Sequence, residues 1–253
     1  AYEIRNCDWS SDVCSSDPPA SGLSTEGLVG VILATSGYVG VSADYLGLGD
    51  SAGTHPFHHA ASEATAVVDA LRAGRAACST NGVALSGQVF LAGYSQGGHA
   101  TMATLREIES RHAAEFSITA AAPMAGAFDL SGVTLDDALS DRPVPNPYYF
   151  AFLLQMLVEL YGVAPSLADV LQPTFDKTLP PLLDGSVDSG QVNAILPAVP
   201  NRILKPGYLA AIRSNPDHPV RRALRDNDLA SRAPRARSEE HTSELQSQFR
   251  ISY

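Results

Sequence analysis

The sequence has few cysteines, little tryptophan and no long apolar run. Its 253 residues include three cysteines and one tryptophan. The longest apolar stretch, residues 148–158, contains Gln155 and is far shorter than the roughly 20 residues that a membrane-spanning helix needs. We therefore expect no transmembrane helix.

Basic side chains are also scarce. The 17 Lys and Arg residues stand against 27 Asp and Glu residues, which gives a net charge of −10. This balance excludes a basic nucleic-acid-binding protein. The hydrophobic content of 45% excludes a disordered acidic tail, and the length is enough for one large domain or two small ones with a buried core.

Both ends of the chain read as foreign to the rest. Residues 8–17 can be encoded by a DNA stretch whose reverse complement, read from its second base, encodes residues 238–247. The complementarity continues outward to the first and last three residues. We interpret residues 1–17 and 237–253 as translated sequencing-library adapter, and the part between them as an internal fragment.

Removing these ends changes the inventory. Fourteen basic and 20 acidic side chains remain, and Cys78 becomes the single cysteine, so no disulfide framework is expected. An internal fragment can also lack a signal peptide, a first strand or a final catalytic residue.

Apolar runs and helical periodicity alternate through residues 18–129. Residues 38–44, 88–93 and 118–125 read as buried strands, and residues 59–75 and 96–111 read as amphipathic helices. This order predicts a parallel sheet of the α/β class. We therefore assign residues 18–129 to a partial α/β core.

Composition changes after Asp129, where prolines become frequent and regular βα units stop. We interpret residues 130–236 as a mostly helical cap or lid inserted over the sheet. Its clearest helix, residues 149–161, has an apolar face that needs a partner. This face either contacts lipid or an acyl chain as a lid, or simply forms the core of the cap.

The chemistry-bearing motif is Gly93-Tyr94-Ser95-Gln96-Gly97, which fits G-x-S-x-G. Its serine stands where an expected strand ends and an expected helix begins, the setting of a nucleophile elbow. The flanking glycines, Gly93 and Gly97, suit a turn in which neighbouring backbone comes too close for a Cβ. The motif predicts Ser95 as nucleophile and the backbone N–H of Gln96 as an oxyanion-hole donor; the alternative is an exposed Gly/Ser turn without chemistry.

Four stretches, residues 37–51, 55–57, 91–100 and 215–229, resemble the bacterial and fungal secretory lipases and related esterases of the α/β-hydrolase superfamily. The resemblance implies a truncated α/β-hydrolase sheet with a mostly helical cap. It also implies hydrolysis of carboxylic esters through an acyl-serine on Ser95, without a cofactor or metal. The implied partner is a small ester or lipid, with transient contact to a lipid interface and no nucleic acid, and the implied location is secreted or in the cell envelope.

The sequence departs from the family pattern in the rest of the catalytic triad. In the superfamily the serine is followed by an acid and a histidine on loops after later strands. After Ser95 this chain offers His99 in the same helix, His112 at its end and His218 in a turn of the cap. We interpret the first two as structural and keep His218 as a minor candidate base. The loop before the helix expected near residues 25–34, which normally gives a second oxyanion donor, is also missing, so we expect this fragment to be inactive.

Other interpretations remain open. The glycines of residues 47–53 follow an expected strand, as in a dinucleotide loop, but their spacing is G-x-G-x-x-x-G. His55, His58 and His59 could hold a metal, although no carboxylate or cysteine partner stands at ligand spacing. The alternatives in function are a non-catalytic binding protein that keeps the elbow without a triad, and a peptidase or acyltransferase on the same fold.

Overall fold

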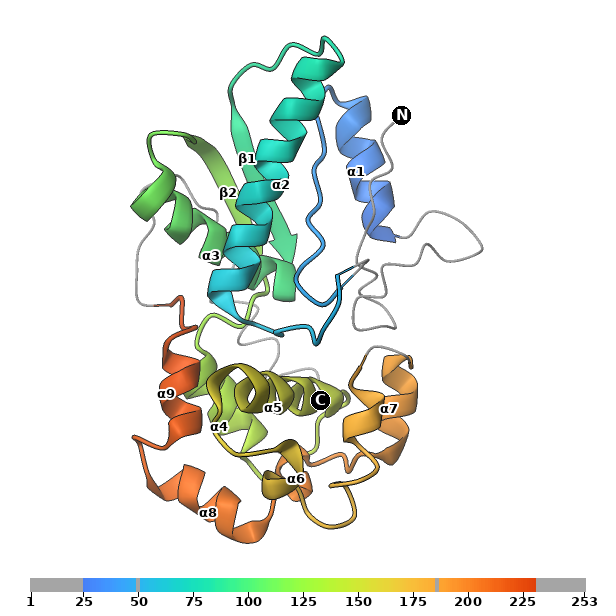
Figure 1. The fold of residues 1–253 in the computed structure, drawn as a ribbon, viewed down its shortest axis with the longest axis vertical. Helices are drawn as coiled ribbons and strands as arrows, with labels where there is room; N and C mark the ends of the chain where they lie inside the picture. The colour runs from blue at the N-terminus through green and yellow to red at the C-terminus, as the bar shows by residue number, and fades with distance from the viewer. Residues whose placement is uncertain (1–24, 49–50, 185–186, 231–253) are drawn as a thin grey trace.

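The computed structural model describes residues 25–48, 51–184 and 187–230. Within these residues the chain forms an α/β part and a helical part, which lie one above the other in Figure 1. The two ends interpreted as adapter, residues 1–17 and 237–253, lie outside the described residues.

The α/β part is built on two parallel strands, β1 (Val89–Tyr94) and β2 (Ile118–Met124). Helix α3 (Gln96–Glu107) follows β1 directly and packs on both strands, and α2 (Ala60–Thr80) packs on α3. A π-helical segment (Ile108–His112) extends α3. The expected strands 88–93 and 118–125 and the expected helices 59–75 and 96–111 are therefore present, with α2 longer by five residues at its C-terminal end.

The prediction of a strand over residues 38–44 is wrong for this structure. These residues follow α1 (Thr25–Thr35) in irregular backbone, and the described sheet contains only β1 and β2. A strand needs a hydrogen-bonded neighbour, and side chains of this segment such as Val39 and Val41 are exposed rather than buried. In place of β-sheet hydrogen bonds, the segment contacts β1 through the rings of Tyr38 and Phe90, whose centroids are 5.7 Å apart.

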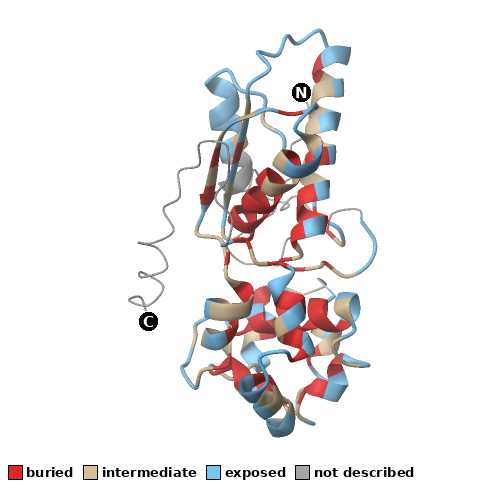
Figure 2. Cartoon of the chain, turned by 90° about the vertical axis from the view of Figure 1, so that its left-hand side faces the viewer, coloured by how far each residue is buried: buried red, intermediate tan, exposed pale blue. Residues whose placement is uncertain are grey.

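The helical part spans residues 130–229 and encloses one large apolar core (Figure 2). Its centre is α5 (Tyr148–Tyr161), which is buried on nearly all sides from Tyr148 to Val158 and ends at Gly162, whose φ of 59° closes the helix in the left-handed region. No helix in the described part of the chain is long and apolar enough to cross a membrane. Shorter helical elements surround α5: a π-helix (Leu130–Thr134), α4 (Leu135–Ala138), α6 (Leu167–Val170), a 3₁₀ turn (Pro180–Leu182), α7 (Ser189–Ile195), a second 3₁₀ turn (Pro200–Ile203), α8 (Pro206–Ser214) and α9 (Pro219–Arg225).

Asn227, just after α9, joins the helical part to the α/β part. Its side-chain Oδ1 accepts a hydrogen bond of 2.9 Å from the backbone N–H of Ala60, the first residue of α2. Its Nδ2 donates to the hydroxyl of Tyr161 at 2.8 Å. One buried amide therefore connects the beginning of α2 with the end of α5.

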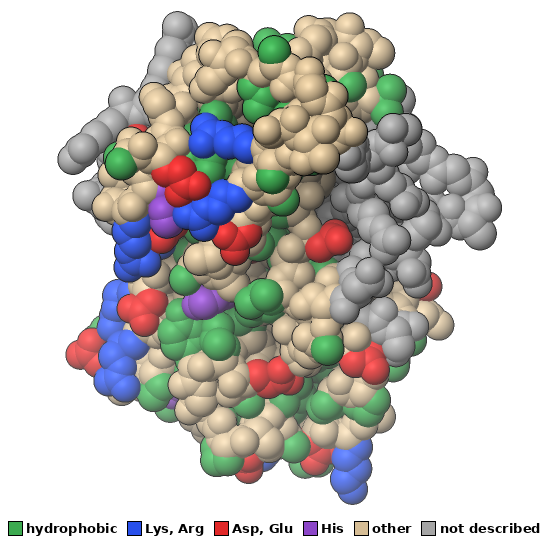
Figure 3. Space-filling view, turned by 45° about the horizontal axis from the view of Figure 1, so that its top comes forward, with side chains coloured by type: hydrophobic (Ala, Val, Ile, Leu, Met, Phe, Trp, Pro, Cys, Tyr) green, Lys and Arg blue, Asp and Glu red, His purple; other side chains and the backbone are tan. Residues whose placement is uncertain are grey.

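The surface of the α/β part mixes charges of both signs. Arg72 lies 2.8 Å from Asp69 and 2.7 Å from Glu115, and these side chains are exposed. Figure 3 shows basic and acidic side chains next to one another on the face turned forward. Exposed pairs of this kind contribute at most about 1 kcal/mol each, so the fold depends mainly on its buried apolar clusters.

Candidate functional site

Ser95 forms the turn between β1 and α3. Its backbone has φ 55° and ψ −117°, a left-handed conformation that residues other than glycine rarely adopt. The Ser95 N–H donates to the carbonyl of Met124 at 3.0 Å, and the Ser95 carbonyl accepts from the N–H of His99 at 3.2 Å. Such a conformation costs roughly 1–3 kcal/mol and persists because the strands and the helix hold it. The predicted strand–turn–helix setting is therefore present.

Two glycines allow the strand and the helix to approach this closely. A Cβ on Gly93 would lie 2.1 Å from the carbonyl oxygen of Gly97. A Cβ on Gly98 would lie 2.3 Å from the carbonyl oxygen of Met124. The G-x-S-x-G motif predicts that Gly93 and Gly97 have to be glycine. The requirement at Gly98 depends on contact with β2 and could not be inferred from the motif.

Gln96 is the first residue of α3, and the first N–H groups of a helix have no acceptor within it. Its backbone N–H is therefore free of an intrahelical bond, as an oxyanion donor has to be. Its side chain is buried, and Nε2 donates to Glu63 Oε1 at 2.8 Å and to His55 Nε2 at 2.7 Å. Tyr94, on the other side of Ser95, is exposed.

The contacts of His55 fix its protonation state. Nδ1 lies 3.0 Å from the carbonyl oxygen of Leu46, which can only accept, so Nδ1 carries the proton. Nε2 accepts from the amide of Gln96 and is unprotonated. Burial lowers the pKa of His55, in agreement with a neutral ring.

Glu63 and His99 form a fully buried pair between α2 and α3. Glu63 Oε2 lies 2.6 Å from His99 Nδ1, and His99 Nε2 lies 3.1 Å from the carbonyl oxygen of Asn227. Because that carbonyl can only accept, Nε2 is protonated, and a second proton lies between Nδ1 and the carboxylate. His99 thus has both nitrogens engaged, which agrees with its interpretation as a structural residue.

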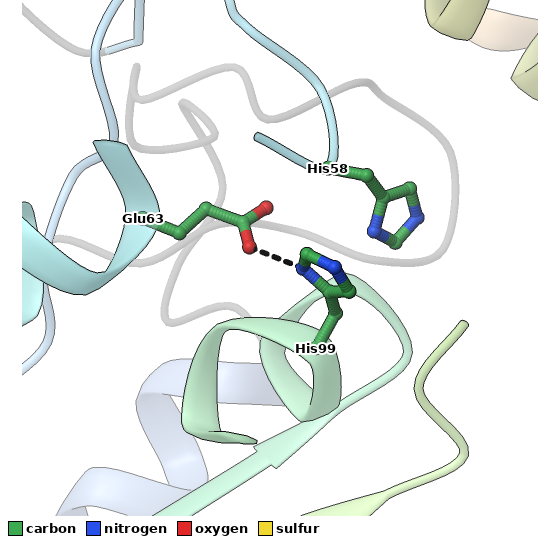
Figure 4. A group of neighbouring side chains, drawn as sticks. All are labelled: His58, Glu63 and His99. Carbon is green, nitrogen blue, oxygen red and sulfur yellow. Dashed lines mark hydrogen bonds and ion pairs between the residues drawn. The ribbon is translucent and has the colours of Figure 1, made fainter. Parts of the chain in front are cut away.

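His58 completes this group (Figure 4). It is buried, has φ 58°, and its ring packs edge-on against that of His99 with centroids 4.9 Å apart. Its Nδ1 is buried without any hydrogen-bond partner. Burial first, and then the nearby His99 and His55, hold the pKa of His58 well below its usual range. One ligand atom from each of His58, Glu63 and His99 lies within 4.8 Å of the others.

His58 therefore does have a carboxylate partner, Glu63, contrary to the expectation that no carboxylate stands at ligand spacing from these histidines. Glu63 follows His58 by five residues, and the start of α2 turns its side chain back toward the loop. His99 follows His58 by 41 positions and joins the group only through the packing of α3 on α2. Neither His55 nor His59 belongs to the three-residue group.

The remaining histidines lie elsewhere. His218 caps the N-terminus of α9, where its Nδ1 accepts from the N–H of Val220 at 3.3 Å. His112 lies 3.6 Å from Glu107 at the end of the α3 segment. Among the residues that the structure describes, no histidine or carboxylate is hydrogen-bonded to the hydroxyl of Ser95.

Positions 49 and 50 of the glycine-rich segment 47–53 lie outside the described residues. Its described part is a turn in which the N–H of Gly47 donates to the hydroxyl of Ser51 at 3.0 Å. The chain continues from it into the loop that carries His55 and His58, and α2 begins only at Ala60. The structure therefore places a loop between these glycines and the helix.

Solved structures with a similar fold include esterases. The rice cell wall degrading esterase LipA from Xanthomonas oryzae has a TM-score of 0.70 and 34% identity, over 77% of this chain and 53% of LipA. A ligand-bound form of the same esterase gives 0.69 and 33% over the same shares. A candidate hydrolase from Legionella pneumophila, with a TM-score of 0.73 and 24% identity over 80% of this chain and 54% of its own, shares the fold.

A family model described as secretory lipase matches residues 20–141. Together the two comparisons identify the chain as an α/β-hydrolase of the secretory lipase and esterase type. This confirms the family resemblance and the fold class inferred from the sequence. A search of curated proteins gives no match. The chain spans about half the length of the solved LipA structures that it matches.

The neutral His55 leads to a prediction for this site. As pH falls below the ordinary histidine pKa of about 6.5, His55 binds a proton in the unfolded chain but stays neutral in the folded chain. The free energy of unfolding should therefore fall. The slope for one such group is up to about 1.4 kcal/mol per pH unit. Urea unfolding at pH 7.5, 6.5 and 5.5, with EDTA present, measures it.

His55→Gln should make this slope smaller, because the titrating ring is gone while a side chain that can meet Gln96 remains. His112→Gln serves as the control, since His112 is partly exposed and lies beside carboxylates. An unchanged slope in His55→Gln would show that other groups cause the acid sensitivity.

Proposed function

We propose that the whole protein is a carboxylic ester hydrolase that acts through an acyl-enzyme on Ser95. The observation that carries this proposal is the strained left-handed conformation of Ser95 at the junction of β1 and α3. A turn of this kind at the end of a strand is the setting in which a nucleophile elbow exposes its hydroxyl, and the N–H of the residue after the nucleophile, here Gln96, is then an oxyanion-hole donor. The match to the secretory lipase family model and the likeness to an esterase support the ester substrate.

The reaction follows from acyl-transfer chemistry. The Ser95 Oγ attacks the ester carbonyl carbon while a base takes its proton, and the carbonyl oxygen becomes an oxyanion that the Gln96 N–H stabilises. Collapse of this intermediate breaks the bond to the alcohol, which leaves with the proton. Water then attacks the acyl-serine, and the acid product and free Ser95 are released.

The base, the acid that orients it and the second oxyanion donor come, in this proposal, from parts of the whole protein outside this chain. This chain alone is accordingly inactive, because an unassisted serine hydroxyl is a weak nucleophile at neutral pH. The pairing of both nitrogens of His99 with Glu63 and Asn227 supports this assignment, since that ring has no free lone pair for Ser95.

We further propose that the helical part is the cap over the acyl-binding site. Phe57, in the loop before α2, stacks on Tyr149 of α5 with ring centroids 6.0 Å apart. The edge of this aromatic pair is open to solvent, because Tyr149 is 40% exposed. An apolar pair between the two parts suits the acyl chain of an ester, with transient contact to a lipid interface. The family's name supports secretion or a place in the cell envelope.

Hydrolysis of 4-nitrophenyl butyrate tests the proposal. The longer protein from the same gene should turn the ester over, whereas purified residues 18–236 should give no rate above the uncatalysed reaction. Turnover by residues 18–236 would place a base such as His218 within this chain and overturn the assignment. Hydrolysis by neither protein would favour the alternative of a binding protein that keeps the elbow without catalysis.

A further inference from the structure

The group of His58, Glu63 and His99 lies behind the elbow, and the reaction on Ser95 does not use it. Three donor atoms of two kinds, two imidazole nitrogens and one carboxylate oxygen, lie within 4.8 Å of one another. Each side chain is more than nine-tenths buried. They come from three separate places: the loop before α2, the first turn of α2, and α3 (Figure 4).

The unpartnered nitrogen of His58 is the second observation. A buried polar atom without a partner costs about 1–3 kcal/mol, and nearly all such atoms in native structures are bonded to something. His58 Nδ1 is one of the few buried side-chain atoms in the described residues without a bond, and it belongs to this group. The loop also keeps His58 in a left-handed conformation at φ 58°.

We propose that His58, Glu63 and His99 bind a zinc ion. Two histidines and one carboxylate are a donor set that zinc prefers, and neutral imidazole is the form that ligates. Tetrahedral ligands at 2.0–2.1 Å from zinc are about 3.3 Å apart, so small side-chain rotations from the present arrangement bring the three atoms to the metal. The fourth position is left to water.

Binding exchanges a proton for the metal. In the metal-free pair one proton lies between His99 Nδ1 and Glu63, and zinc displaces it to solvent while both atoms become ligands. Glu63 Oε1 keeps the amide of Gln96, and His99 Nε2 keeps the carbonyl of Asn227. These two outer contacts would orient the ligands, as hydrogen bonds to metal-bound carboxylates and imidazoles commonly do. The ion would join the loop, α2 and α3 directly below the nucleophile turn.

Calorimetric titration of the full 253-residue chain with ZnCl₂ tests this inference without any activity readout. The titrated protein carries Cys7→Ser, Cys14→Ser and His241→Gln, so that these side chains add no zinc affinity, and it is first dialysed against EDTA and then buffer. We expect one zinc ion per chain and no binding of Mg²⁺, which prefers oxygen ligands. Absence of stoichiometric zinc binding by protein with a helical circular dichroism spectrum would overturn the inference.

The decisive variants are His58→Asn and its neighbour His59→Asn. Asparagine tolerates the left-handed backbone of residue 58 and is also a good N-cap at residue 59, so both variants keep the local backbone. His58→Asn should lower the zinc affinity by more than the 10–100-fold that loss of an outer contact costs, and His59→Asn should leave it unchanged. Equal affinities of the two variants would contradict the assignment of His58 as a ligand.

Discussion

Replacing Ser95 with alanine should lower kcat/KM for 4-nitrophenyl butyrate by at least about 10⁴-fold in the longer protein. The reason is that no acyl-enzyme can form without the hydroxyl, and loss of a catalytic serine in hydrolases of this chemistry costs up to about 10⁶-fold in kcat. Because the alanine adds no atoms to a turn that is partly exposed, the fold should persist. Initial rates under matched enzyme concentrations measure the effect.

Ser110→Ala is the matched control for this prediction. Ser110 lies beyond the far end of α3, is exposed, and donates to the carbonyl of Arg106 at 2.8 Å. Its removal should change kcat/KM by less than twofold. A loss of less than 10-fold in Ser95→Ala would contradict the role of Ser95 as nucleophile, since covalent catalysis cannot tolerate that substitution.

Glu63→Ala should destabilise the chain by roughly 3–5 kcal/mol, the cost of removing one partner of a buried charged pair. Glu63 is fully buried and accepts from both His99 and Gln96. Its loss leaves the Nδ1 proton of His99 and one amide hydrogen of Gln96 without acceptors, while His99 Nε2 keeps the carbonyl of Asn227. Urea unfolding followed by circular dichroism gives the difference in the free energy of unfolding.

Asp69→Ala on the same helix is the control. Asp69 is 72% exposed and pairs with Arg72, a surface contact worth at most about 1 kcal/mol. If the two substitutions destabilise the chain equally, the buried network does not hold the start of α3 in place. A Glu63→Gln variant, which can still accept one hydrogen bond, should fall between Glu63→Ala and the parent.

The elbow was predictable from the sequence because it is local. Gly93, Ser95 and Gln96 are consecutive or nearly so, and an apolar run before them with a periodic helix after them determines where the turn falls. Helices α2 and α5 were predictable for the same reason, since their apolar residues recur at helical spacing.

The buried network was not predictable, because it depends on long-range packing. Glu63 and His99 are 36 positions apart in the sequence, and His99 and Asn227 are 128 positions apart. No sequence motif links these three residues. The prediction of a strand over residues 38–44 is wrong for a related reason. A β-rich run predicts an extended chain, but only a neighbouring strand makes it part of a sheet.

Covalent labelling tests the central claim, the assignment of Ser95 as nucleophile, most directly. The longer protein is treated with a fluorophosphonate until ester hydrolysis stops, digested, and analysed by mass spectrometry. We predict one phosphonyl group per chain on Ser95, in the peptide that contains Gly93 and Gln96, and no labelling of Ser95→Ala. A modified residue elsewhere that accounts for the lost activity would contradict the assignment.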